Sequence, residues 1–150
     1  MTNKKLAHIN IFLFYLLSFT WGLPMTLIGI LVALVLLLTG HKPKTWNYCL
    51  YFNVGENWGG CSIGPVFLTG KKEYESVNNH EHGHAIQNCF LGVFMPFVVA
   101  LPSAIRYQYL THKYFNKGKE PPKPYDSIWF EHSATVLGTE LNKWLNGEKL

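Results

Sequence analysis

Charged residues are scarce in this chain of 150 amino acids. Asp, Glu, Lys and Arg together make up 15% of the residues, whereas 48% are hydrophobic. A typical soluble domain carries about 25% charged residues. The shortage is also uneven, because residues 11–38 contain no charged side chain at all. This pattern argues against a freely soluble domain and favours attachment to a membrane.

Cysteine is rare as well, and its spacing excludes a zinc knuckle. Cys49, Cys61 and Cys89 do not form closely spaced pairs, and their odd number provides no disulfide framework. Cys49 and Cys61 could meet across a hairpin, but free thiols are the simpler expectation. The net charge of +4 is modest, and no segment resembles a nucleic-acid-binding module. We therefore expect no nucleic-acid partner.

The uncharged N-terminal run is long enough to cross a membrane. As one helix, residues 11–38 would extend about 42 Å, which exceeds the roughly 30 Å of a bilayer core. A tilt or a kink at residues 22–24 would absorb the excess length. Alternatively, Trp21 marks the interface and a shorter span begins at Pro24. The run is too long for the apolar part of a signal peptide, and no small-x-small cleavage site follows it.

These features predict one N-terminal transmembrane helix followed by one domain. The anchor comprises residues 1–40, with the span at about 11–38, and the domain comprises residues 41–150. We therefore expect a single-pass membrane protein that has the lipid bilayer as a partner. Lysines stand on both sides of the span, so the positive-inside comparison leaves the orientation open. The oligomeric state is open too.

The domain itself has an α+β pattern. Residues 48–54 and 61–68 are rich in β-forming residues and flank a Gly-rich turn, which predicts a hairpin. Pro65 marks the second run as an edge strand, because proline cannot donate to a ladder. A helix is expected after the polar break at residues 70–79, and another runs to about Leu145. The candidate N-caps are Ser76, Asn78 and Asn79 for the first helix and Asp126 or Ser127 for the last.

A second uncharged segment, residues 89–105, is at the lower limit of a membrane span. Pro96 and Pro102 interrupt its helical hydrogen bonding. We expect this segment to form domain core, or to dip into one leaflet and return, because candidate metal ligands lie on both sides of it.

The residues His80-Glu81-His82-Gly83-His84 match the pattern H-E-x-x-H at the start of the expected helix. Positions i and i+4 share a helix face, so His80 and His84 can bind one cation, and neutral imidazoles suit Zn²⁺. Glu81 is then the candidate catalytic base for a zinc-activated water. In an extended conformation, His82 would join the other two histidines on one face and indicate plain metal binding.

A catalytic zinc ion needs a third protein ligand. Glu131, near the start of the last helix, is the preferred candidate, and His132 and Asp126 are the alternatives. Thr135 lies one helical turn after Glu131, where it could hydrogen-bond a ligand imidazole or Glu131 itself.

The two motifs together resemble those of the gluzincin metallopeptidases, particularly the HtpX-like membrane peptidases and the minimal soluble gluzincins. The matching residues are His80, Glu81, His84, Glu131, Ala134, Thr135, Leu137 and Gly138. The resemblance covers residues 59–145, and Thr135 stands where the family has Asp. It implies a zincin-like fold of β-hairpin with edge strand, H-E-x-x-H helix and C-terminal ligand helix. It also implies that an extended substrate pairs with the edge strand, here Cys61, Ser62, Ile63 and Gly64.

The sequence thus predicts a membrane-anchored zinc metallopeptidase that hydrolyses peptide bonds in a peptide or protein substrate, with one Zn²⁺ per chain. Tyr125 and His112 are candidates for the side chain that polarises the scissile carbonyl. Two other functions stay open: a zinc protein without catalytic activity, and a metal-delivery protein that uses the three histidines of residues 80–84.

Overall fold

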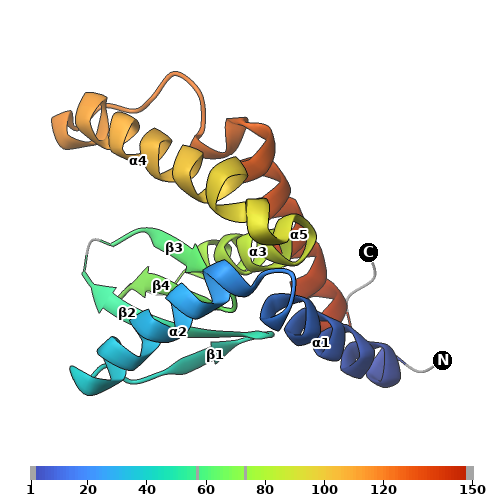
Figure 1. The fold of residues 1–150 in the computed structure, drawn as a ribbon. Coiled ribbons are helices and arrows are strands. Elements are labelled where there is room, and N and C mark those ends of the chain that lie inside the picture. Colours follow the sequence, from blue (N-terminus) through green and yellow to red (C-terminus); the bar gives the residue numbers. More distant parts are fainter. Residues whose placement is uncertain (1–2, 57, 73, 148–150) are drawn as a thin grey trace.

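The computed structural model describes residues 3–56, 58–72 and 74–147, and these residues form an α+β fold (Figure 1). They contain five α-helices and one four-stranded mixed sheet. The strands are β1 Lys44–Trp46, β2 Cys49–Gly55, β3 Gly60–Ile63 and β4 Val66–Gly70. The α-helices are α1 Asn3–Phe19, α2 Leu23–Leu38, α3 Glu75–Leu91, α4 Leu101–Lys113 and α5 Trp129–Leu145.

The strands pair differently from the predicted hairpin. Their order is β1-β2-β4-β3, with β2 parallel to β4 and the two outer strands antiparallel to their neighbours. The expected strand at residues 61–68 is interrupted at Gly64 and Pro65, so the hairpin joins β3 to β4 instead. Gly64 has φ +65°, and proline holds φ near −65°, which suits a two-residue turn with positive φ at its first position. β3 lies at the edge of the sheet, and Pro65 lies in the turn beside it.

The predicted continuous helix over residues 11–38 is also wrong, because the run forms two helices. α1 and α2 are bent by 92° at Thr20–Gly22. The Gly22 N–H donates to Leu17 O at 2.8 Å, and the Asn88 side-chain amide donates to Gly22 O at 3.3 Å. A Cβ on Gly22 would lie 2.4 Å from that amide nitrogen, so the close approach requires glycine. The bend therefore lies near the predicted kink, but it is far sharper than a kink within one helix.

The second uncharged segment reverses direction. α3 is followed by short helical turns at Gly92–Phe94 and Pro96–Ala100, and α4 then leaves at 116° to α3. Among the described residues, no single helix is both long and apolar enough to cross a membrane. The two bent pairs, α1 with α2 and α3 with α4, have the length and composition of a span only when both members are counted.

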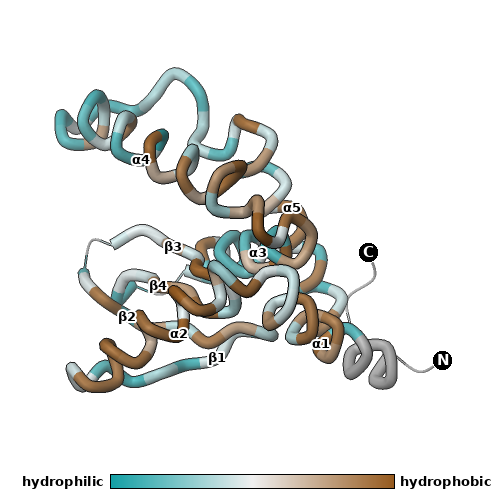
Figure 2. Tube along the Cα trace, in the orientation of Figure 1, coloured by the Kyte–Doolittle hydropathy of each residue, from teal (hydrophilic) through white to brown (hydrophobic). Residues whose placement is uncertain are grey.

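Three clusters of buried hydrophobic residues fill the interior, and each includes a residue of α1 or α2. The clusters are Phe14 with Tyr48, Cys49, Tyr51, Phe67, Ala85 and Cys89; Met25 with Met95, Val99 and Phe130; and Ala33 with Phe52 and Val66. The inner faces of α1 and α2 are therefore part of the core. Their outer faces carry exposed hydrophobic residues (Figure 2). All three cysteines are free, as expected.

Two glycines allow α3 and α5 to cross in backbone contact. A Cβ on Gly83 of α3 would lie 1.8 Å from Ala134 O, and a Cβ on Gly138 of α5 would lie 1.7 Å from Asn79 O. Only a residue without a side chain fits at either position. This close crossing brings the start of α5 against the H-E-x-x-H residues of α3.

The N-cap residues of α3 and α5 are not the ones predicted from the sequence. α3 already begins at Glu75, so Ser76, Asn78 and Asn79 lie inside it, and no side chain caps it. Residues 125–127 form a separate helical turn before α5, whose N-cap is Ile128. In both cases tertiary contacts hold the helix start without a side-chain cap.

Candidate metal centre

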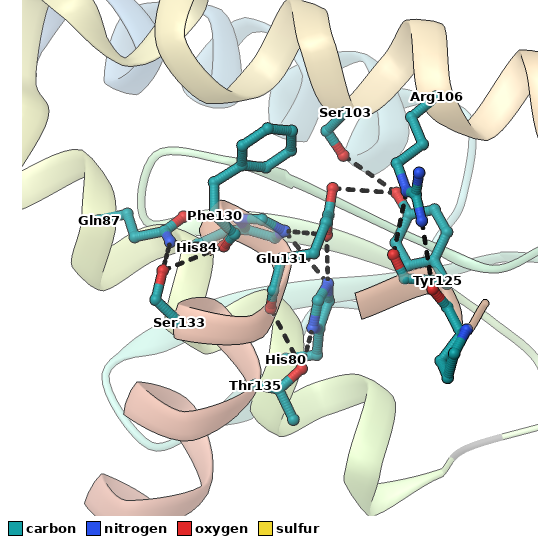
Figure 3. A network of polar contacts seen from close by, with 11 residues as sticks. His80, His84, Gln87, Ser103, Arg106, Tyr125, Phe130, Glu131, Ser133 and Thr135 are labelled. Carbon is teal, nitrogen blue, oxygen red and sulfur yellow. Dashed lines mark hydrogen bonds and ion pairs between the residues drawn. The ribbon is translucent and has the colours of Figure 1, made fainter. Parts of the chain in front are cut away.

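Three side chains from two helices converge on one point beside the α3–α5 crossing (Figure 3). His80 Nε2 lies 3.0 Å from Glu131 Oε2, His84 Nε2 lies 3.2 Å from the same oxygen, and the two nitrogens are 3.1 Å apart. The two histidines are one turn apart on α3, so their rings share a face, and α5 supplies Glu131. These three residues form a group with the spacing of metal ligands.

The donor set fits a small divalent cation such as Zn²⁺. Tetrahedral zinc ligands lie about 2.0–2.1 Å from the ion and hence about 3.3–3.4 Å from one another. The separations of 3.0–3.2 Å between the three ligand atoms are close to this value. Two imidazoles and one carboxylate also leave one tetrahedral position open, as in catalytic zinc sites.

Further hydrogen bonds orient each ligand. His80 Nδ1 lies 2.9 Å from the Thr135 hydroxyl, and His84 Nδ1 lies 2.8 Å from the Gln87 side-chain oxygen. If Nε2 of each histidine held a cation, each Nδ1 would carry the proton and would donate it to that oxygen. The Gln87 amide donates in turn to Phe130 O at 2.7 Å, on the helix that carries Glu131.

Glu131 uses its two oxygens differently. Oε2 faces both histidines, whereas Oε1 accepts a hydrogen bond from the Tyr125 hydroxyl at 3.2 Å. Ser103 of α4 lies 3.0 Å from the same hydroxyl, and Arg106 of α4 donates to Tyr125 O at 3.1 Å. α4 therefore holds the segment before α5 in place and fixes the carboxylate.

The electrostatics of the centre favour an ionised Glu131. Its side chain is fully buried, and burial raises the pKa of the carboxyl, but the hydrogen bonds with His80 and His84 outweigh this effect and leave the pKa well below its usual range. For His84, burial lowers the pKa, yet the contacts with Glu131 and Glu81 leave it above its usual value. The site thus holds negative charge facing two imidazoles.

Glu81 lies beside this centre and is almost completely buried. One of its oxygens, Oε2, has no hydrogen-bond partner among the described residues. Burial raises the pKa of this carboxyl, and the nearby histidines partly offset the rise. The carboxylate lies against Gly60 of β3, where a Cβ would be 2.0 Å from Glu81 Oε1. A poorly solvated carboxylate with a raised pKa has the character of a proton acceptor.

A cleft of about 680 Å³ connects these groups. His80, Glu81 and His84 form its floor, β3 forms one wall, and α4 with the turn before it forms the opposite wall. The β3 residues that line it include Gly60, Cys61 and Ser62, and those on the opposite side include Val99, Ser103 and Tyr107. Of the proposed substrate strand, Cys61 and Ser62 thus line the cleft. Ile63 packs with the Met25 cluster, and Gly64 lies in the turn against Thr26.

Other candidates lie away from the three ligands. His82 is fully buried, its ring packs against Phe14 and Tyr48, and burial lowers its pKa to about 4. His132 is exposed, and Asp126 lines the cleft without joining the ligand group. Of the two candidates for polarising a carbonyl, Tyr125 lines the cleft, whereas His112 is exposed outside it.

Sequence reasoning missed three residues that build the centre: Gln87, Ser103 and Gly60. Gln87 was detectable, because it follows His84 by three residues on one helix. Ser103 and Gly60 reach the site only through the tertiary fold. Neither a scan against known protein families nor searches of curated proteins and of solved structures found a match to this chain.

Proposed function

We propose that this chain is a membrane-attached, zinc-dependent peptidase of the gluzincin type. One observation carries the proposal: ligand atoms of His80, His84 and the fully buried Glu131 lie within 4.8 Å of one another, and both histidines line a cleft together with Glu81. A purely structural metal site would have no use for an unpaired buried carboxylate next to it.

The geometry of the described residues supports one role for each of them. His80, His84 and Glu131 hold the metal, and bound Zn²⁺ supplies a Lewis acid that polarises a carbonyl and acidifies water. Glu81 accepts a proton from the attacking water and passes it to the leaving amine. Tyr125 lies in the same cleft and is the better placed of the two candidates to hydrogen-bond the developing oxyanion, for which it would redirect the O–H that it donates to Glu131 Oε1.

The substrate is a peptide or protein in an extended conformation. β3 is an edge strand, and Gly60, Cys61 and Ser62 line the cleft beside Glu81. An edge strand offers unpaired backbone groups with which a peptide can form a ladder, and this places the scissile bond over the floor of the cleft. Thr135, at the position of the family's Asp, supports catalysis through its contact with His80 Nδ1.

The proposal is tested by separating metal binding from turnover. Full-length protein is purified as wild type, Glu81→Gln and His84→Ala, with Glu140→Gln and His112→Ala as controls, because Glu140 is partly exposed on α5 and His112 is exposed outside the cleft. Zinc is measured by mass spectrometry and cleavage with labelled casein. We expect Glu81→Gln to keep about one zinc and lose about 10²–10⁴-fold in rate. His84→Ala should lose both zinc and activity.

Other outcomes favour other functions. If the wild type binds one zinc per chain but cleaves neither casein nor a quenched-fluorescent peptide library, it is a catalytically silent zinc protein. Full activity of Glu81→Gln rejects the assigned base. A large loss of zinc in His82→Ala favours a metal-delivery protein, although the burial of His82 among aromatic rings opposes that reading.

A further inference from the structure

The two sharp bends of the chain meet and form one exposed apolar surface. Trp21, at the bend between α1 and α2, donates its indole N–H to Phe90 O at 3.2 Å, and its ring contacts that of Phe94 at 6.0 Å. A Cβ on Gly92 would lie 2.2 Å from the Trp21 ring, so the indole sits directly on the backbone of the second bend. We call the exposed residues at this junction the apolar corner: Phe19, Trp21, Leu23, Phe90, Phe94 and Phe97.

Two exposed apolar stripes continue from the corner along the helices. The first stripe lies on α2 and comprises Leu27, Leu31, Leu34 and Leu38. The second runs from the turn before α4 onto α4 and comprises Phe97, Leu101 and Ile105. Phe90 and Phe97 are 71% and 72% exposed, far more than a large apolar side chain needs to be in a domain with a formed core. Figure 2 shows hydrophobic residues over these parts and hydrophilic ones at the far end of α4.

Three polar side chains at and next to the α1–α2 bend have hydrogen-bond partners within the protein, as a lipid environment favours. The Trp21 indole, the Thr20 hydroxyl and the Thr26 hydroxyl all donate to backbone carbonyls. The N–H and the C=O of Gly22 both form hydrogen bonds. In hydrocarbon each unpaired group costs several kcal/mol, so the pairing of these groups at a helix break favours a lipid partner. The Asn88 Oδ1 atom, which has no hydrogen-bond partner among the described residues, is fully buried beneath the bend and does not face the exposed surface.

The charge distribution fits a bilayer as well. Residues 11–38 and 89–105, which form the corner and its stripes, contain no charged side chain. Basic residues follow each stripe: Lys42 comes after α2, and Lys113, Lys117 and Lys119 come at and after the end of α4. An apolar centre with lysines at its outer ends matches acyl chains bordered by anionic headgroups.

The same helices are arranged to enter a bilayer without crossing it. α2 has 16 residues, or about 24 Å, which is shorter than a bilayer core of roughly 30 Å. Its inner face lies on the sheet, where a Cβ on Gly29 would be 2.1 Å from Ile63 O. On α1, the Tyr15 hydroxyl donates to Tyr48 O at 2.7 Å. Each of these two helices therefore has one face packed against the rest of the domain, and only its other face is available to lipid.

We propose that the apolar corner inserts into one leaflet of a lipid bilayer, and that both bent helix pairs return to the side from which they enter. The start of α1, the segment after α2 and the loop after α4 then all face the same aqueous compartment. This attachment does not depend on the metal centre. It replaces the expected single-pass anchor with a monotopic one.

The sidedness test uses single cysteines in the full chain. Lys5→Cys, Lys42→Cys and Lys119→Cys are made with the three native cysteines changed to Ala, and sealed membrane vesicles are treated with an impermeant maleimide before and after permeabilisation. We expect all three positions to show the same accessibility. Labelling of residues 5 and 42 from opposite sides identifies a crossing chain and overturns the proposal.

A second test keeps the native cysteines and probes insertion directly. One double variant places two carboxylates in the apolar corner through Phe90→Glu and Phe97→Glu. The matched control is a second double variant with Tyr74→Glu and Val136→Glu. Tyr74 is 53% exposed at the opposite end of α3 from Phe90, and Val136 is 45% exposed on α5. Membranes from expressing cells are washed with alkaline carbonate, and resistance of each variant to trypsin reports folding.

We expect the corner variant to be extracted at least about tenfold more than wild type, and the control variant to stay membrane-bound. A corner variant that stays bound like the wild type overturns the proposal, as does release of wild type by the wash. Neither test reads zinc or peptidase activity, so a failure here refutes this mode of membrane attachment and is distinct from a failure of the metal centre or of the peptidase activity.

Discussion

Replacing Gly138 by alanine is expected to disrupt the metal centre from outside it. A Cβ at residue 138 would lie 1.7 Å from Asn79 O and 3.0 Å from Gly83 N, and both neighbours are backbone atoms inside a helix. Cβ atoms essentially never approach a neighbour closer than 3.0 Å. α3 and α5 must therefore separate by at least about 1.3 Å at this point.

The displacement is large compared with what the ligands tolerate. His80 and His84 belong to α3 and Glu131 belongs to α5, so their separations of 3.0–3.2 Å change with the helix spacing. Metal–ligand distances are usually held to about 0.2 Å. Overpacking of a close contact costs about 1–3 kcal/mol of unfolding free energy. We expect Gly138→Ala to lose that much stability and at least about tenfold in zinc affinity.

The measurement compares Gly138→Ala with Gly55→Ala. Among the residues that the structure describes, a Cβ on Gly55 would meet nothing closer than 3.7 Å, so this control adds the same methyl group without an overlap there. Thermal unfolding followed by circular dichroism gives the stability, and competition with a chromophoric chelator gives the zinc affinity. If Gly138→Ala binds zinc and unfolds like the wild type, the two helices do not cross as closely as described, and the explanation of the site fails.

Three further substitutions test individual contacts. Gly60→Ala should keep the zinc but lower the turnover number at least about tenfold, because its Cβ would displace the Glu81 carboxylate; loss of zinc would contradict this. Gln87→Ala should weaken zinc binding about 10–100-fold by removing the partner of His84 Nδ1, and an unchanged affinity in chelator competition would refute the role. His82→Ala should cost about 2–4 kcal/mol in urea unfolding, because the ring is fully buried, while its zinc content stays that of the wild type.

The close crossing of α3 and α5 also links the metal to the stability of the fold. The fully buried Glu131 carboxylate faces two imidazoles at the contact between these helices. A bound cation supplies the positive charge that this carboxylate needs in the interior, so zinc binding and folding should reinforce each other. The unfolding temperature of wild type is therefore expected to rise with zinc and to fall after treatment with a chelator, as scanning calorimetry would record.

The local features of the site could be derived from the sequence. The i, i+4 spacing of His80 and His84 determines that their rings share a helix face, whatever surrounds that helix. Glu131 was chosen because a third ligand is needed and it lies near the start of the last helix, and Thr135 was chosen because it lies one helical turn after Glu131. The uncharged runs were likewise predictable, because composition acts locally. The predicted edge strand over residues 61–68 was correct only for β3, because Pro65 lies in a turn and β4 lies between β2 and β3.

Tertiary structure decided everything that depends on contacts between distant segments. Whether residues 49–55 pair with β3 or with β4 depends on long-range packing rather than on strand propensity, which is similar in both. The sharp bend at Gly22 exists because Asn88, far along the chain, occupies the place of a side chain there. Gly60 and Ser103 reach the site for the same reason. Periodicity reports which face of an element is apolar, but only the packed molecule determines which element that face meets.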